Sequence, residues 1–224
     1  GNKQYDDGLI TLNELEDIDQ NKLKDLMVGR EIADEYYRSD FEATSSGEIA
    51  LKCENLTTHQ ISGVNFHVEK GEILGIAGLT DSGMRQVGQI VFGLLQPLEG
   101  NVTVIDDAGD EIEIRNTKQA IDQKIGYVSK NRDREALMLL SSIKENIVLP
   151  SLNIIKKGPY ISPKTEDEIT NKYAAEMDIL MSNIDQHVIN LSGGNKQKVV
   201  LAKWLANGSE ILILDCPTRG IDVG

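Results

Sequence analysis

The segment "GEILGIAGLTDSGMRQVGQIVFG", residues 71–93, constrains the fold of this chain more than any other. A continuously apolar run over residues 73–77 comes directly before Gly78 and Gly83, and a segment of apolar residues at helical spacing follows. Such a run is typical of a strand covered on both faces. A glycine loop between a strand and a helix turns backbone N–H groups and the helix N-terminus toward phosphates. The segment therefore predicts a buried strand, a phosphate-binding turn and a helix.

The charges of this loop differ from those that phosphate binding favours. Met84 stands where such loops carry a lysine, Arg85 stands where they carry a hydroxyl, and Asp81 adds a negative charge. A unit charge about 4 Å away is worth roughly 4 kcal/mol at an effective dielectric constant of 20. The loop is therefore expected to bind nucleotide weakly or to serve as scaffold. Taken alone, it also fits an ordinary strand, turn and helix with two glycines.

The rest of the chain predicts a mixed α/β domain. Alternating or short apolar runs predict strands over residues 49–56, 62–71, 101–106, 111–115, 124–129 and 210–215. The first two are expected to be antiparallel, and the last is expected to be buried. Helical patterns cover residues 142–149, 164–183 and 194–207, and Trp204 of the last helix is expected in the core. Thr165 and Glu168 have the spacing of a capping box at the start of the second helix.

Bulk composition limits the partners. The chain has 224 residues, with 23 basic against 36 acidic residues and a net charge of −13, which disfavours nucleic acid as a partner. It contains no apolar run of roughly 18 residues, so a membrane role is expected to go through another subunit. Cys53 and Cys216 stand singly, without metal-ligand spacing, which suits a reducing compartment such as the cytoplasm.

The first 47 residues differ in composition from the remainder. They are polar and acidic, contain one helix-like stretch, "NELEDIDQNKLKDLMVG", and end in a Ser/Gly cluster. A domain boundary is predicted near Gly47, although a floppy N-terminal tail fits the composition as well.

Two later motifs add specificity to the glycine loop. "LSGGNKQKVVLAKWLA", residues 191–206, reads as a helix with a polar cap, and "ILILDCPTRGID" follows closely. In this order the three motifs resemble the ATP-binding domains of ABC transporters, and the resemblance covers residues 49–224. "GLTDSGMR" corresponds to Walker A, "LSGGNKQ" to the signature, "ILILD" to Walker B and "TRGID" to the D-loop. "GEILGIAG", "IGYV", "SIKENI" and "PTRGIDVG" are most similar to the sugar-import subgroup, of the ribose and galactose type.

The resemblance implies a fold and an organisation. It implies an ABC-type P-loop NTPase fold with a mainly parallel core sheet, an antiparallel β subdomain and a helical subdomain over about residues 131–195. "LKDLMVGREI" is similar to the stretch that joins the first ABC domain to the second in that subgroup. Residues 1–47 are therefore expected to be the end of a preceding domain plus a linker. Residues 48–224 are expected to be a second domain whose C-terminal part is missing.

The resemblance also assigns site residues. It implies ATP contacts from loop residues, from signature residues and from one D-loop residue: Gly78, Leu79, Thr80, Asp81, Ser82, Gly83, Met84, Arg85, Leu191, Ser192, Gly193, Gly194, Asn195, Gln197 and Asp222. It implies that Asp215 orients Mg²⁺. Cys216 stands where the family has a glutamate that polarises the attacking water, and Lys130 occupies the Q-loop position. A thiol with an ordinary pKa of about 8.5 is a poor base near neutral pH.

Four departures, at Asp81, Met84, Cys216 and Lys130, fall in one site, whereas the signature is intact. The leading hypothesis is a domain with an impaired ATP site that lends its signature to a partner ABC domain in sugar import. Its expected location is the cytoplasmic face of the cell membrane, on permease subunits. Two alternatives stay open: a working ATPase in which Arg85 replaces the lysine, and an interaction module that uses the fold without transport.

Overall fold

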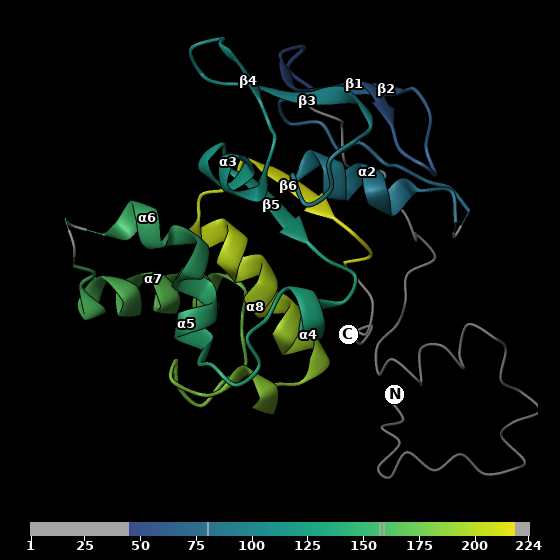
Figure 1. Ribbon diagram of the computed structural model, residues 1–224. Coiled ribbons are helices and arrows are strands. Elements are labelled where there is room, and N and C mark those ends of the chain that lie inside the picture. Colours follow the sequence, from purple (N-terminus) through teal and green to yellow (C-terminus); the bar gives the residue numbers. More distant parts are fainter. Residues whose placement is uncertain (1–44, 80, 157, 159, 218–224) are drawn as a thin grey trace, which may run out of the picture. The chain divides into compact units, whose positions relative to one another are not determined.

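An antiparallel sheet forms the upper layer of the protein as viewed in Figure 1. The structure, a computed structural model, describes residues 45–79, 81–156, 158 and 160–217. The sheet has the spatial order β2-β1-β3-β4, with β1 Ile49–Thr57, β2 Val64–Glu69, β3 Glu99–Ile105 and β4 Glu111–Glu113. β1 pairs with both β2 and β3 in antiparallel register, which confirms the antiparallel strands predicted for residues 49–56 and 62–71.

A two-stranded parallel sheet lies below the antiparallel sheet. β5 Ile125–Val128 and β6 Ile211–Leu214 pair in register from Ile125 with Ile211 to Val128 with Leu214. β5 is buried along its whole length, whereas Leu212 and Leu214 of β6 are 38% and 49% exposed. The strand predicted over residues 210–215 is therefore confirmed, but one face of it is open rather than buried.

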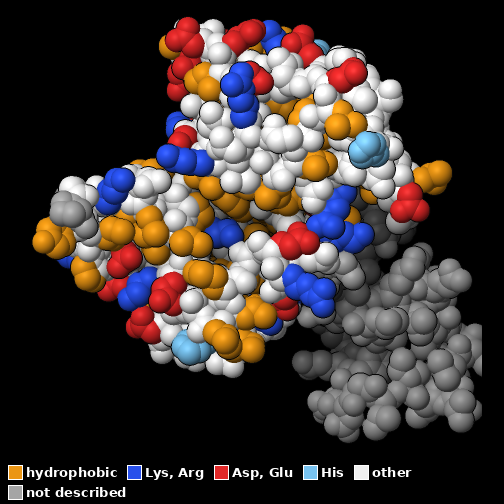
Figure 2. All heavy atoms as spheres, viewed as in Figure 1, with side chains coloured by type: hydrophobic (Ala, Val, Ile, Leu, Met, Phe, Trp, Pro, Cys, Tyr) orange, Lys and Arg blue, Asp and Glu red, His pale blue; other side chains and the backbone are white. Residues whose placement is uncertain are grey.

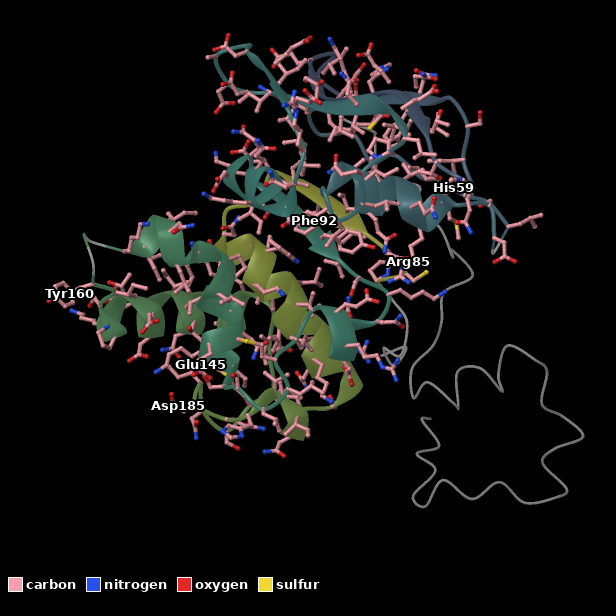
Figure 3. All side chains as sticks on the ribbon, in the orientation of Figure 1. His59, Arg85, Phe92, Glu145, Tyr160 and Asp185 are labelled. Carbon is pink, nitrogen blue, oxygen red and sulfur yellow. The ribbon has the colours of Figure 1, made fainter. Side chains whose placement is uncertain are left out.

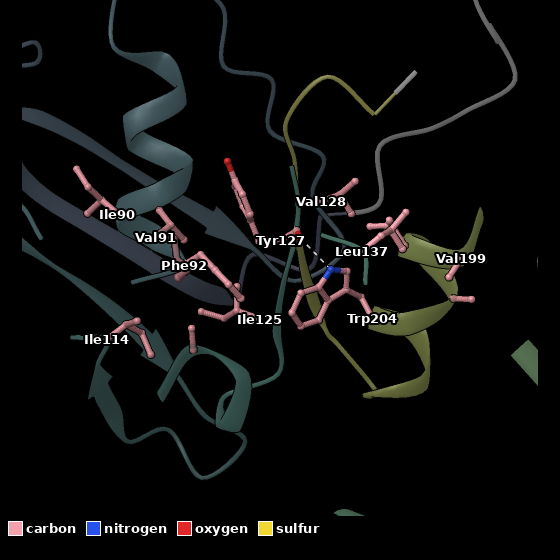
Figure 4. Close-up of a cluster of buried hydrophobic side chains, with 14 of the residues drawn as sticks. Ile90, Val91, Phe92, Ile114, Ile125, Tyr127, Val128, Leu137, Val199 and Trp204 are labelled. Carbon is pink, nitrogen blue, oxygen red and sulfur yellow. Dashed lines mark hydrogen bonds between the residues drawn. The ribbon is translucent and has the colours of Figure 1, made fainter. Parts of the chain in front are cut away.

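Aromatic side chains join β5 to α2 (Met84–Val91) and α8 (Gly193–Ala206). Phe92, which caps α2, stacks on Tyr127 of β5, with ring centroids 5.5 Å apart. The same ring meets Trp204 of α8 edge to face at 5.5 Å. The indole Nε1 of Trp204 donates to the carbonyl oxygen of Tyr127 at 2.9 Å, drawn as a dashed line in Figure 4. Trp204 is 5% exposed, which confirms its predicted place in the core.

A helical group follows β5 and occupies the lower left of Figure 1. α5 and α7 both pack on α8, and the first of them opens with a capping box between Ser142 and Glu145. The elements between the two parallel strands, other than α8, are α4 Arg132–Glu135, α5 Ile143–Val148, η2 Leu149–Ser151, α6 Leu152–Ile155, α7 Pro163–Glu176 and η3 Val188–Asn190. A short helix, α3 Thr117–Asp122, precedes β5. The helices from α4 to η3 fall within the helical subdomain predicted over about residues 131–195, whereas α3 lies before it, and the limits of that subdomain stay a prediction.

Exposed apolar side chains gather at the tip of this helical group. Leu149, Ile154 and Tyr160 are 46%, 66% and 77% exposed, and the hydrophobic spheres at the left of Figure 2 mark this region. In the part of the chain that the structure describes, no helix is long and apolar enough to cross a membrane.

Two local predictions are wrong. Residues 73–77 form no strand, and Ile73 and Ile76 are 81% and 48% exposed. A strand needs a neighbour to receive its backbone hydrogen bonds, and here a cavity of about 1030 Å³ adjoins both this segment and β6.

The capping box expected from Thr165 and Glu168 is also absent. α7 begins earlier, after Ser162, with Pro163 in its first turn, and no side chain caps it. Proline fits the first turn of a helix because that turn leaves N–H groups without an intrahelical partner. The helix therefore starts at the proline rather than at the later threonine, and it ends at Glu176 instead of continuing to residue 183.

Candidate functional site

The glycine loop leads into α2 through a left-handed residue. Gly83 is the N-cap of α2 with φ of 82°, and no side chain caps this helix. A Cβ at this position would collide with Cγ2 of Ile61, so both the backbone angle and the available space require glycine. Asp81 and Ser82 are exposed. The glycine turn predicted at the start of α2 is therefore present at Gly83, although the strand predicted before it is missing.

Arg85, in the first turn of α2, contacts two acidic side chains. Its Nη2 donates to both carboxylate oxygens of Glu135, at 2.9 and 2.8 Å. Its Nε lies 3.0 Å from Oδ2 of Asp215, which directly follows β6. Figure 3 shows Arg85 near the carboxyl end of the two parallel strands, while His59 lies farther out on an exposed bend. The guanidinium group thus joins α2, α4 and the end of β6.

The pKa values of Arg85, Glu135 and Tyr127 are shifted by their surroundings. Hydrogen bonding to Glu135 raises the pKa of Arg85 above its ordinary value, so the guanidinium stays charged. Burial acts to raise the pKa of the Glu135 carboxyl, but hydrogen bonds from Arg85 and Asn131 outweigh it and the pKa is lowered. Burial and the nearby Asp215 carboxylate raise the pKa of Tyr127 to about 12. The Tyr127 hydroxyl, protonated at neutral pH, donates to Oδ2 of Asp215 at 3.3 Å.

Two further residues predicted for this site, Cys216 and Lys130, are exposed, and two others lie outside the described residues. Cys216 follows Asp215 directly, is exposed and has φ of 53°, a left-handed conformation that is uncommon for a residue with a side chain. Lys130 is exposed in the turn after β5. Thr80 and Asp222 lie outside the described residues. The structure therefore brings Arg85 and Asp215 together and leaves Lys130 and Cys216 at the surface.

The second motif, residues 191–197, forms the start of α8. Ser192 is the N-cap of this helix, and its Oγ accepts hydrogen bonds from the backbone N–H and the Nδ2 of Asn195, at 3.4 and 2.9 Å. Asn195 is itself fixed because its Oδ1 accepts from the N–H of Leu180 at 2.8 Å. Ser192 is exposed, and a Cβ added at Gly194 would meet open space. Figure 1 shows α8 and α2 beginning in different parts of the protein.

Gln197 and Lys203 of α8 face inward rather than toward the helix start. Gln197 is 3% exposed, and its Oε1 lies 3.4 Å from Nη1 of Arg132. Lys203 is 7% exposed, and its Nζ donates to the carbonyl oxygen of Ala136 at 2.6 Å. Burial lowers the pKa of Lys203 to about 8. Both residues contact the segment around α4, which also carries the Arg85 partner Glu135.

Sequence reasoning missed Glu135 and Tyr127 at this site. Glu135 lies in the charged run "NRDRE", whose residues alternate in sign and read as an ordinary exposed face. Tyr127 lies in "IGYV", where it reads as an apolar strand residue. Both are brought to Arg85 and Asp215 by tertiary packing, because 50 residues separate Arg85 from Glu135 and 88 separate Tyr127 from Asp215.

The residues around Asp215 offer few ligands for a metal ion. Among residues 45–79, 81–156, 158 and 160–217, no group of three or more histidine, cysteine, aspartate or glutamate side chains has the arrangement of a metal site. Asp215 itself is already paired with Arg85. A divalent cation at Asp215 would therefore meet a guanidinium group at one of the two carboxylate oxygens.

Comparisons with known proteins agree on one family. A family model described as "ABC transporter" matches residues 61–219. The chain is similar to the xylose import ATP-binding protein of Thermoanaerobacter pseudethanolicus, with 38% identity over 223 residues, covering 96% of this chain and 43% of that protein. It is similar to the ribose import ATP-binding protein of Clostridium perfringens strain 13, with 39% identity, covering 94% of this chain and 41% of that protein. The chain spans less than half the length of these relatives.

Solved structures support the same fold. A dimeric post-hydrolysis state of an ATP-binding cassette bound to ADP and Pi aligns with a TM-score of 0.64 and 26% identity, covering 77% of this chain and 76% of that one. A nucleotide-free ATP-binding cassette from an ABC transporter aligns with a TM-score of 0.60 at 20% identity, covering 77% of this chain and 71% of that one, a likeness of fold alone. The predicted α/β P-loop NTPase fold is confirmed by these alignments together with the family match.

Proposed function

This chain belongs to the ABC transporter family of ATP-binding domains, and from that premise we propose that it drives import of a sugar by completing the ATP site of a partner domain. Its relatives are named as import proteins for ribose and xylose. The proposed partners are an intact ABC ATP-binding domain and membrane permease subunits, at the cytoplasmic face of the membrane.

The observation that carries this proposal is the contrast between the two motifs. The signature segment, residues 191–197, begins α8 at an exposed serine, whereas the loop before α2 has its cation engaged by two carboxylates. Asp81 adds a negative charge to that loop, and Cys216 replaces the carboxylate that would polarise a water. The proposal assigns the α8 motif to a partner's nucleotide and gives the α2 loop no hydrolytic role.

The start of α8 is suited to a γ-phosphate. α8 has 14 residues, so its first-turn N–H groups and its dipole favour an anion at the N-terminus. The Ser192 oxygen accepts two hydrogen bonds from Asn195, and its own O–H proton is the group with which it can donate to a phosphate oxygen. Donors fixed before the reaction stabilise the charge that develops on the transferred phosphoryl group.

Contacts between α4 and α8 offer a route from this motif toward the permease. Nζ of Lys196 lies 3.5 Å from a carboxylate oxygen of Asp133, and Lys203 holds the carbonyl oxygen of Ala136 just after α4. α4 directly follows the exposed turn at Lys130. We assign to this turn the transmission of domain closure to the membrane subunits.

The proposal is tested on the full chain combined with an intact ABC ATP-binding domain. We expect the wild-type chain to stimulate the partner's ATP turnover. Gly194→Asp should reduce this stimulation by about tenfold or more, because a carboxylate at the start of α8 would repel the γ-phosphate. Gly194→Ala is the matched control, because its Cβ also enters open space but carries no charge. Equal stimulation by Gly194→Asp and Gly194→Ala would contradict the proposal.

The alternative of a working ATPase that uses Arg85 is less well supported. A substitute for the loop lysine must be available to the β- and γ-phosphates, whereas the guanidinium group of Arg85 is held between Glu135 and Asp215. ATP turnover by the full chain alone, lost in Arg85→Ala, would favour that alternative.

A further inference from the structure

Two positions that hold Mg²⁺ in P-loop NTPases contact each other directly in this chain. In that class the metal ion is bound by the hydroxyl residue after the loop lysine and by the aspartate that ends the Walker B strand. The corresponding residues here are Arg85 and Asp215, and Nε of Arg85 lies 3.0 Å from Oδ2 of Asp215. A charged nitrogen therefore contacts a carboxylate oxygen of the residue that would be a metal ligand in that class.

The donor set does not fit Mg²⁺. This ion requires oxygen ligands in near-octahedral geometry, whereas a guanidinium group has five donors, no acceptor and a permanent positive charge. Hydrogen bonding to Glu135 raises the pKa of Arg85 further, so proton loss gives no route to a neutral ligand. A divalent cation brought to Asp215 would be repelled by the guanidinium group at close range.

We propose that Arg85 takes the place of the divalent cation at Asp215, so that the nucleotide site at the α2 loop excludes Mg²⁺. This inference rests on the proposed function, since it describes the domain's own impaired nucleotide site. It specifies that the impairment includes exclusion of the metal ion, in addition to weaker attraction for phosphate.

Glu135 is the positioning residue for this arrangement. Arg85 and Glu135 are each only partly buried, with side chains 36% and 39% exposed, whereas the Asp215 side chain is 15% exposed. A lone arginine at such a site has many rotamers, but Nη2 bound to both Glu135 oxygens leaves Nε on the side of Asp215. Tyr127 completes the surroundings of Asp215 with its hydroxyl group at 3.3 Å. The aspartate thus has a cation and a hydrogen-bond donor supplied by the protein.

The test measures Mn²⁺ binding to the full chain by electron paramagnetic resonance, with Mn²⁺ alone and with Mn²⁺ and ADP. In the wild-type chain, Asp215→Asn should leave Mn²⁺ binding unchanged, because the aspartate binds no metal. Arg85→Ser restores the hydroxyl and removes the charge, and it should raise Mn²⁺ affinity by about tenfold or more. Adding Asp215→Asn to Arg85→Ser should abolish that gain.

Two controls separate charge from general disruption. Arg85→Lys keeps the positive charge and should still exclude Mn²⁺. Arg115→Ser removes an arginine that pairs with Glu113 on the exposed side of the antiparallel sheet, so Mn²⁺ binding should not change.

Either of two results would overturn the inference: Mn²⁺ binding by the wild-type chain that Asp215→Asn removes, or a folded Arg85→Ser chain with no gain in Mn²⁺ affinity. Should Arg85→Ser fail to fold, the comparison of wild type with Asp215→Asn still decides. A failure of the proposed function would instead appear in the Gly194 variants, which leave Arg85 and Asp215 intact.

Discussion

α2 and α8 both begin at a glycine motif, yet their first turns are arranged differently. α2 starts at Gly83 without a side-chain cap, and its first turn carries an arginine that pairs with two carboxylates. α8 starts at Ser192, whose side chain caps the helix and is fixed by Asn195. A helix N-terminus favours an anion through its unpaired N–H groups, but Asp81 just before α2 adds a negative charge that opposes one. This difference is why we assign the phosphate-facing role to α8.

The same two helices each carry a cationic side chain, and the two side chains differ in burial and in their partners. Arg85 of α2 is partly exposed, and its pKa is raised by hydrogen bonding to Glu135. Lys203 of α8 is buried beside Trp204, and burial lowers its pKa to about 8. The cation of α2 is therefore fixed by charge partners, whereas that of α8 bears a desolvation penalty that a backbone carbonyl only partly offsets.

The largest expected effect comes from the glycine that begins α2. Gly83→Ala should lower the free energy of unfolding by about 2 to 4 kcal/mol, because a Cβ is strained at positive φ and collides with Ile61. Urea denaturation followed by circular dichroism measures this loss. Gly194→Ala in α8 is the matched variant and should change stability by less than about 1 kcal/mol, since its Cβ meets open space. Equal losses in both variants would show that the two helix starts do not differ as described.

The next effect concerns the buried cation of α8 and depends on pH. A lysine in the unfolded chain has a pKa of 10.5, whereas the pKa of Lys203 in the folded chain is about 8. Between these two pH values the unfolded chain binds more protons, so raising the pH favours the folded state. The wild type should therefore gain roughly 2 kcal/mol relative to Lys203→Met between pH of about 7.5 and about 10. Denaturant unfolding of both chains at the two pH values measures this difference. A parallel pH dependence of the two would contradict the lowered pKa.

The smallest effect is expected at the partly exposed pair of α2. Glu135→Gln should lower the free energy of unfolding by less than about 1 kcal/mol at neutral pH, because solvent screens the pair. The pKa of Glu135 is lowered in the folded state, so its contribution is present above the ordinary value of 4.5 and is lost as pH falls below it. The variant and the wild type should therefore converge in stability in acid. Glu113→Gln, at the exposed pair with Arg115, is the control outside the site. Unlike a change at Glu135, which positions Arg85, it should leave the exclusion of Mn²⁺ at Asp215 unchanged.

Local sequence patterns predicted much of the fold, because the spacing of apolar residues reflects which face of a helix or strand is buried. Alternation in residues 62–71 predicted β2, and the helical spacing after Ser192 predicted α8. The apolar run over residues 73–77 predicted a strand that the structure does not form, because strand formation depends on a neighbour that a local pattern cannot supply. The capping-box pattern at Thr165 likewise gave way to a proline start at Pro163.

The candidate site was predictable only in part. Glycine spacing and motif order indicated the loop, the signature and Asp215 from the sequence, and their roles stay predictions. The pairing of Arg85 with Glu135 and Asp215 was not predictable, because it requires α2, α4 and the end of β6 to meet in space. The sequence therefore indicated which ligands the loop lacks, while only the structure shows that Arg85 contacts Glu135 and Asp215.

The position of Trp204 gives the protein an internal optical reporter. It is the chain's single tryptophan. Its indole N–H donates to the backbone carbonyl of Tyr127, and the hydroxyl group of Tyr127 donates to Asp215. Indole emission shifts with the polarity and hydrogen bonding of its surroundings. A movement of Tyr127 caused by a change at Asp215 would therefore change the emission wavelength of Trp204. Events at the ion pair can thus be followed in the unlabelled protein by its fluorescence.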